Sequence, residues 1–208
     1  MSNNTPQQQP VLTMFAGING SGKSTLYTLQ QSKYNVDIGV RICPDDILTE
    51  SGGDWKDYSD VYASGRVAHE KIDECIANKE SFNWEFTLIS NYVLKVLRRA
   101  KDAGYQLKLN FILVDDVDVA LKRIEKRVQN GGHGIPEDVV RSRFAKQLIN
   151  METALPMIDM SVFFDNNECL QVVGFSTTEQ PLEFFDKNTK VTRELLGIIK
   201  DVYAHQEK

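Results

Sequence analysis

The sequence predicts an α/β fold in which a mostly parallel sheet is covered by helices on both faces. Apolar strand-like runs alternate with amphipathic helical stretches, and a glycine-rich turn separates the first strand from the first helix. Right-handed crossovers are nearly obligatory between parallel strands of one sheet, so this alternation leaves few other topologies. With 208 residues, of which 41% are hydrophobic, the chain can bury the core of one domain.

We expect that single domain over residues 11–208, after a polar, glutamine-rich tail over residues 1–10 that we expect to be disordered. The expected parallel strands are Val11–Ala16, Ile38–Cys43, Phe82–Thr87, Tyr105–Val114 and Ser161–Asp165. Leu170–Phe175 and Leu182–Phe185 are expected to form a small antiparallel addition. The pattern indicates helices over Ser24–Gln31, from Tyr58 to Asn78, from Ser90 to Gly104, from Val117 to Val128, from near Pro136, and over Val191–Ala204.

The helix that begins at Tyr58 has an apolar stripe with helical spacing. The stripe consists of Tyr58, Val61, Tyr62, Gly65, His69, Ile72 and Ile76. Because His69 belongs to this stripe, the pattern favours a buried core histidine over a catalytic one.

The turn after the first strand reads G-I-N-G-S-G-K-S-T from Gly17 to Thr25, a complete G-x-x-x-x-G-K-[ST] phosphate-binding loop, or Walker A motif. Its glycines allow the backbone N–H groups to point inward at one phosphate. Lys23 is expected to reach the β- and γ-phosphates, and Ser24 to offer its hydroxyl to Mg²⁺. The motif therefore predicts ATP and Mg²⁺ as ligands, bound by Gly17, Asn19, Gly20, Ser21, Gly22, Lys23, Ser24 and Thr25.

Acidic residues follow two of the expected strands at the edge where α/β proteins bind ligands. Asp45 and Asp46 come directly after the second strand, and one of them could accept the proton of an attacking substrate hydroxyl. The alternative for Asp46 is an N-cap of the next short helix. Glu85 and Thr87 close the third strand, where they would face the acceptor, since a carboxylate in an apolar strand is costly without a partner.

Basic residues are expected on the helices above that edge. Arg123, Lys126 and Arg127 share one helical face before the glycine-rich run Gly131–Gly134. Two helices hinged at glycines predict a mobile lid around residues 117–150, in which Arg127 could close onto the triphosphate. The alternative is a solvated charged face. Asp115 and Asp116 are expected to cap the helix that begins at Val117.

Several segments together resemble the short, single-domain branch of the zeta-toxin family. They are G-I-N-G-S-G-K-S-T-L, C-P-D-D-I, A-S-G-R, S-F-N-W-E-F-T-L, K-D-A-G-Y, R-V-Q-N-G-G-H-G-I-P-E-D-V-V-R-S-R-F and F-F-D-N, over roughly residues 11–166. Zeta toxins are P-loop kinases, similar in fold to nucleotide and shikimate kinases, that phosphorylate the 3′-hydroxyl of the sugar in UDP-N-acetylglucosamine.

The resemblance implies site residues as well as an activity. It implies Lys23 on the phosphates, Asp45 as the base, and Glu85 and Thr87 at the acceptor sugar, with Asp46 and Arg66 also on the substrate side. It further implies lid residues Arg123 or Arg127, with His133 near the transferred phosphate where the toxin prototypes carry an arginine. A nucleotide sugar is then the expected acceptor, and an antitoxin protein a possible partner.

The composition excludes some classes of partner and location. A net charge of −5 argues against nucleic acid as a partner, and the absence of a long apolar run argues against a membrane. Three dispersed cysteines suit a reducing compartment, so a cytoplasmic protein is expected. Two alternatives stay open at this stage: a kinase of another small hydroxyl compound, and a P-loop module that hydrolyses nucleotide slowly and acts through a protein partner.

Overall fold

A computed structural model describes residues 9–34, 37–177, 183–184 and 190–204. Most of the expected tail, residues 1–8, lies outside the described residues. The strands are β1 (Val11–Ala16), β2 (Val40–Ile42), β3 (Phe82–Phe86), β4 (Gln106–Leu113), β5 (Met160–Asp165), β6 (Gln171–Thr177) and β7 (Glu183–Phe184). The helices are α1 (Lys23–Tyr34), α2 (Pro44–Glu50), α3 (Tyr58–Asn78), α4 (Asn91–Asp102), α5 (Val117–Gln129), α6 (Glu137–Ala145), α7 (Met151–Ala154), the 3₁₀ turn η1 (Leu155–Met157) and α8 (Lys190–Ala204).

The strands form one sheet in the order β2-β3-β1-β4-β5-β6-β7. The strands β1 to β5 are parallel, whereas β6 and β7 add to the edge of the sheet in antiparallel orientation. The mostly parallel sheet and its antiparallel addition are therefore confirmed. Strand β1 lies between β3 and β4, so the turn that follows it is at the centre of the carboxyl edge.

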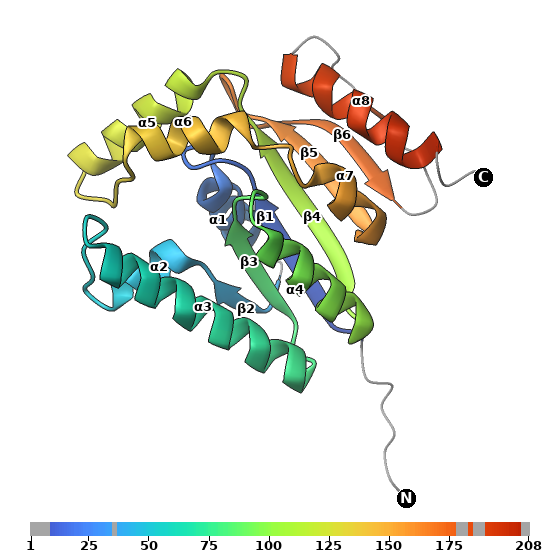
Figure 1. Ribbon diagram of the computed structural model, residues 1–208, viewed down its shortest axis with the longest axis horizontal. Helices are drawn as coiled ribbons and strands as arrows, with labels where there is room; N and C mark the ends of the chain where they lie inside the picture. Colours follow the sequence, from blue (N-terminus) through green and yellow to red (C-terminus); the bar gives the residue numbers. More distant parts are fainter. Residues whose placement is uncertain (1–8, 35–36, 178–182, 185–189, 205–208) are drawn as a thin grey trace, which may run out of the picture.

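Helices cover both faces of the sheet (Figure 1). Helix α1 packs on one face, where Leu26 belongs to one buried hydrophobic cluster with Phe15, Ile112 and Phe164. The other face carries α3, α4, α7, η1 and α8 in one large core cluster, which includes side chains such as Ile72, Leu97, Leu155 and Leu195. The helices α5 and α6 instead lie across the carboxyl edge, opposite α2 and the start of α3 (Figure 1).

The buried face of α3 differs from the apolar stripe expected there. The residues that face the core are Ser64, Ala68, Ile72 and Cys75, whereas Tyr58, Val61 and Tyr62 are exposed. The first turns of α3 extend past the sheet toward a cavity, which Tyr58 and Val61 line, so their apolar character does not report burial in the core. His69 is also exposed rather than buried, which corrects the expectation of a core histidine.

Local sequence explains where several helices begin and end. Ser90 and Asp116 are N-caps whose side chains accept hydrogen bonds from the backbone N–H groups of Tyr92 and Asp118. Helix α3 ends at Asn78, and its C-cap residue Lys79 adopts a left-handed conformation. Helix α2 begins at Pro44 after Cys43, so neither Asp45 nor Asp46 is an N-cap, and both lie in the first turn.

Within the described residues, each helix is too short or too polar to cross a lipid bilayer.

Candidate active site

The glycine-rich loop Gly17–Gly22 connects the buried end of β1 to α1 at the centre of the carboxyl edge. Gly17 and Gly20 adopt φ angles of 145° and 78°, which side chains rarely tolerate. A Cβ atom at Gly17 would lie 2.5 Å from the carbonyl oxygen of Ile112, and one at Gly20 equally close to that of Ala120. The glycines therefore let the loop pack tightly against β4 and α5.

Lys23 and Ser24 begin α1, and their side chains make different contacts. The Lys23 ammonium is buried and donates a hydrogen bond to the carbonyl oxygen of Ile18, 3.0 Å away. Burial lowers the pKa of Lys23, against the opposing charges of Glu85 and Asp45. The Ser24 hydroxyl donates to the two oxygens of Glu85 over 2.9 and 3.1 Å.

Neighbouring segments hold the loop from two sides. The Asn166 amide donates to the backbone oxygen of Ser21 over 2.7 Å, and the Ser21 side-chain oxygen is buried without a hydrogen-bond partner in the described part of the chain. On the other side, Arg143 of α6 donates to the Asn19 side chain over 2.6 Å. Thr25, which follows Ser24 on α1, is exposed.

Asp45 and Asp46 are consecutive but point to different surroundings. Asp45 lines a cavity beside the loop, and its Oδ2 lies 2.7 Å from His133 Nε2. Burial raises the pKa of Asp45, but the hydrogen bond to His133 and the charges of His133, Lys23 and Arg127 outweigh burial and hold it below its ordinary value. Asp46 pairs instead with Arg41 at 3.0 Å. The structure therefore presents Asp45, and not Asp46, to the cavity.

Glu85 at the end of β3 joins the loop to strand β2. Its Oε2 accepts a 2.7 Å hydrogen bond from Arg41 Nη2, in addition to the contacts with Ser24. The guanidinium of Arg41 also lies over the ring of Tyr27, 3.8 Å from its centroid. The contacts thus place the Glu85 carboxylate beside the serine of the loop, a neighbour that the sequence pattern did not predict.

Helices α5 and α6 carry the arginines Arg123, Arg127 and Arg143, of which Arg143 contacts the loop through Asn19. Arg123 donates one hydrogen bond to the Asn167 carbonyl oxygen, and Arg127 donates one to that of His133. Arg123 Nη1 and Arg127 Nη2 are buried without hydrogen-bond partners among the described residues. Unpaired buried guanidinium donors are costly, so these two nitrogens fit an anionic ligand. Burial lowers the pKa of the third arginine, Arg143.

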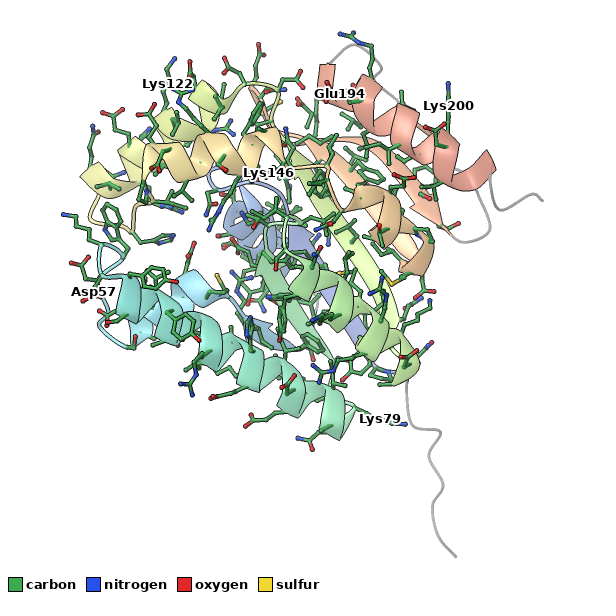
Figure 2. The ribbon with its side chains drawn as sticks, in the orientation of Figure 1. Asp57, Lys79, Lys122, Lys146, Glu194 and Lys200 are labelled. Atoms are coloured by element: carbon green, nitrogen blue, oxygen red, sulfur yellow. The ribbon has the colours of Figure 1, made fainter. Side chains whose placement is uncertain are left out.

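One cavity of about 620 Å³ lies beside the loop and reaches some of these groups. Its lining includes Lys23, Asp45, Glu85, Thr87, His133 and Arg143. Arg66 is not part of the lining; it is exposed and pairs with Glu70 on the outer face of α3 at 3.3 Å. Figure 2 shows the side chains between the start of α3, beside the labelled Asp57, and the α5–α6 pair.

Several lining residues were not singled out from the sequence. The sequence predicted no role for Arg143, and Trp55 lies in a segment without a motif. The ring of Trp55 packs on Gly134, where a Cβ atom would lie 2.7 Å from it. His69, which was expected in the core, stacks instead on Tyr92 with ring centroids 3.9 Å apart and lines the cavity.

Comparison with known proteins identifies the family of this arrangement. The zeta toxin family model matches residues 1–174. The chain belongs to the zeta toxin family. A Haemophilus influenzae protein of unassigned function is 34% identical over 130 residues, which cover 62% of this chain and 89% of that protein.

Solved structures share the fold at low sequence identity. A structure of the PezAT chromosomal toxin–antitoxin system of Streptococcus pneumoniae matches with a TM-score of 0.58 and 17% identity, over 96% of this chain and 88% of that chain. The complex AvrRxo1-ORF1:AvrRxo1-ORF2 with sulphate ions matches with a TM-score of 0.67 and 17% identity, over 89% and 63%. The same complex with ATP gives a TM-score of 0.66 and 15% identity, over 92% and 63%.

Proposed function

We propose that this zeta toxin family protein is an ATP- and Mg²⁺-dependent kinase that transfers the γ-phosphate to a hydroxyl of a nucleotide sugar such as UDP-N-acetylglucosamine. The observation that carries the proposal is the shared cavity: the phosphate-binding Lys23 and the carboxylate of Asp45 line the same space. A phosphate-binding loop alone would serve any nucleotide-dependent protein, whereas a carboxylate facing it can take up a hydroxyl proton.

On the nucleotide side, the chain supplies positive charge and backbone donors. The loop N–H groups and the Lys23 ammonium bind the β- and γ-phosphates, so Lys23 exchanges its hydrogen bond with Ile18 for phosphate oxygens. The unpaired nitrogens of Arg123 and Arg127 supply further donors. In phosphoryl transfer such groups stabilise the charge on the transferred phosphoryl group.

On the acceptor side, Asp45 is the general base. Its side chain is 39% exposed within the cavity, and its lowered pKa keeps it ionised at neutral pH. As the acceptor oxygen attacks the γ-phosphorus, the acceptor O–H bond breaks and its proton moves to Asp45. The bond between the γ-phosphorus and the β–γ bridging oxygen breaks, and ADP leaves with that oxygen.

The donor set beside the loop fits Mg²⁺. In the described part of the chain, no group of three or more His, Cys, Asp or Glu side chains is arranged to hold a metal. Mg²⁺ commonly binds through one or two protein oxygens, water and substrate phosphates, and here Ser24 and Glu85 lie within hydrogen-bond distance of each other. These two residues would hold the ion, which neutralises phosphate charge when bound.

The cavity suits an acceptor larger than a simple hydroxy acid. Its volume of about 620 Å³ lies within the range of sites that enclose ligands of drug size. Aromatic side chains of Trp55, Trp84 and Phe86 form part of its wall, and such rings suit sugars and planar bases. ATP and nucleotide sugars are cytoplasmic metabolites, so we place the protein in the cytoplasm.

Turnover with an acceptor panel tests the proposal. ADP production should depend on UDP-N-acetylglucosamine or a related nucleotide sugar, and mass spectrometry should find an acceptor heavier by one phosphate. Asp45→Asn should abolish most of this signal while ATP still binds. Phosphorylation of a different hydroxyl compound would contradict the proposed acceptor but would still support a kinase activity. ADP production that no acceptor stimulates would favour the slow nucleotide hydrolase that acts through a partner.

We also propose an antitoxin protein as a partner. The structural relative from Streptococcus pneumoniae is described as a toxin–antitoxin system, and AvrRxo1-ORF1 is solved together with ORF2. Growth of cells that express the wild-type chain, compared with cells that express Asp45→Asn, tests this proposal. Equal growth would argue against a toxin and remove the need for an antitoxin.

A further inference from the structure

His133 contacts the proposed base directly. Its Nε2 lies 2.7 Å from Asp45 Oδ2, although the two residues are 88 positions apart in the chain. The side chain of His133 is largely buried, with 22% exposed. Asp45 lies on α2 and His133 on the α5–α6 turn. Their contact therefore depends on the tertiary fold and not on a local sequence motif.

The backbone around His133 is held on two sides. Arg127 Nε donates a 2.8 Å hydrogen bond to the His133 carbonyl oxygen, and a Cβ at Gly132 would lie 2.7 Å from Arg127 Cγ. On the following residue, the ring of Trp55 covers Gly134. The turn is therefore held between α5 and the segment before α3. These contacts limit the positions that the His133 imidazole can adopt.

The contact leaves the two oxygens of Asp45 in different states. Oδ2 is engaged by His133, whereas Oδ1 accepts no hydrogen bond from the described residues. A carboxylate held at one oxygen keeps its second oxygen in a fixed direction, so less orientation is lost when the acceptor hydroxyl binds. The same arrangement, a base oriented by a third group, is general in proton-transfer sites.

We propose that His133 is a positioning residue: it holds Oδ2 of Asp45 so that Oδ1 receives the proton of the acceptor hydroxyl. The inference rests on the proposed function. It means that the α5–α6 turn, which carries His133, orients the base. The acceptor O–H bond breaks, its proton goes to Oδ1, and the acceptor oxygen forms the new bond to phosphorus. His133 keeps its hydrogen bond throughout and takes no part in the transfer to ADP.

The contacts favour this role over one at the transferred phosphate. Nε2 of His133 already contacts the carboxylate of Asp45, so this nitrogen is not free to bind a phosphate oxygen. Unpaired donors for the phosphate are instead present on Arg123 and Arg127. His133 therefore differs in function from the arginines beside it.

A double-mutant cycle between His133 and Asp45 tests the inference. His133→Ala should lower kcat by about 10- to 100-fold, since small misplacements of catalytic groups have effects of that size, with the KM for ATP within about twofold of wild type. The same change in an Asp45→Asn background should have little further effect, because the group that it orients is gone. His133→Gln should recover much of kcat, since its amide can donate to Oδ2.

Two outcomes of the cycle would overturn the inference. If His133→Ala lowers the residual rate of Asp45→Asn by the same factor as that of wild type, His133 acts independently of the base. If His133→Gln is no better than His133→Ala, a hydrogen bond to Oδ2 is not what matters. ATP binding by calorimetry shows whether each variant is folded.

A second measurement needs no acceptor and separates this inference from the proposed function. The chain has three histidines, so nitrogen-15 spectra of histidine-labelled protein can be assigned by substitution. The Nε2 resonance of His133 should shift in Asp45→Asn and stay in place in the matched control Asp46→Asn. An unchanged resonance in Asp45→Asn would rule out the contact whatever the acceptor is, whereas a wild-type protein that phosphorylates no acceptor would contradict only the kinase.

Discussion

The two halves of the cavity are built in different ways. The nucleotide half is the loop Gly17–Gly22 with Lys23 and Ser24, a continuous run whose shape depends on backbone conformation and close packing. The half that we propose for the acceptor is lined by Asp45, Trp55, His133 and Arg143, which come from α2, the segment before α3, the α5–α6 turn and α6. The first half is specified locally, whereas the second exists only when distant segments meet.

The difference predicts how each half responds to substitution. A change in the nucleotide half should alter ATP binding and turnover together, because in the proposed reaction the loop contacts ATP both before and during transfer. A change in the acceptor half should alter turnover with little effect on ATP binding. The following experiments test that separation, beginning with the largest expected effect.

Asp45→Asn should lower kcat by about 10² to 10⁴, the usual effect of removing a general base, while ATP affinity measured by calorimetry stays close to wild type. Because its pKa is held below the ordinary value of about 4, Asp45 loses its charge only as the pH falls through that lower value, so kcat should show no loss from its protonation above about pH 5. The matched control Asp46→Asn should change kcat by less than about fivefold, since it disturbs one partly exposed pair with Arg41. A larger loss in Asp46→Asn than in Asp45→Asn would reverse the choice of base.

Lys23→Ala should lower kcat by about 10² to 10³ and should also weaken ATP binding, because the ammonium compensates phosphate charge in both the bound and the transition state. Calorimetry and steady-state turnover measure the two effects. Lys122→Ala, on the exposed face of α5 (Figure 2), is the control and should change neither. Normal ATP affinity in Lys23→Ala would contradict the assignment of the loop.

Gly20→Ala should destabilise the nucleotide half through packing. Both Gly20 and Gly52 adopt left-handed φ angles, 78° and 71°, but only the Cβ at Gly20 would meet another atom, the Ala120 oxygen at 2.5 Å. Gly20→Ala should therefore lower the free energy of unfolding by about 1–3 kcal/mol more than Gly52→Ala, the typical cost of overpacking. Urea unfolding of both variants measures the difference. Equal losses would show that the loop can move away from α5 at no cost.

Arg66→Ala should have the smallest effect. The Arg66–Glu70 pair is exposed on the outer face of α3, and such pairs contribute about 0–1 kcal/mol to stability. Turnover and the KM for the acceptor should both remain within about twofold of wild type. A clear rise in the acceptor KM would indicate that Arg66 contacts the acceptor. Such a contact would require α3 to rotate when substrate binds.

The same contrast explains what the sequence could predict. The strands, their mostly parallel orientation and the phosphate-binding loop follow from patterns within short windows, and the structure contains each of them. Asp45 could be placed at the carboxyl edge because it follows β2 directly. Its contact with His133 could not be predicted from the residues themselves, since it depends on how the α5–α6 turn folds back over α2.

Errors on α3 have a similar cause. The exposed tyrosines and His69 were judged by helical spacing, which gives the angle between residues but not the direction in which the helix faces. The residues of α3 that pack against the core are Ser64, Ala68 and Ile72. Arg66 therefore faces solvent, and His69 faces the cavity. Glu85 was expected at the acceptor because of its strand position, but its partners Ser24 and Arg41 became visible only in the folded chain.

The central position of β1 also determines when the site can form during synthesis. Strand β1 leaves the ribosome first, yet its neighbours in the sheet are Phe82–Phe86 and Gln106–Leu113. At the usual elongation rate of about 5–20 residues per second, the phosphate-binding loop waits roughly 5–20 s for the strands that flank it. Until then the apolar β1 has no sheet to join. A nascent chain that stops before Gln106 therefore lacks β4, the strand whose end supports Gly17.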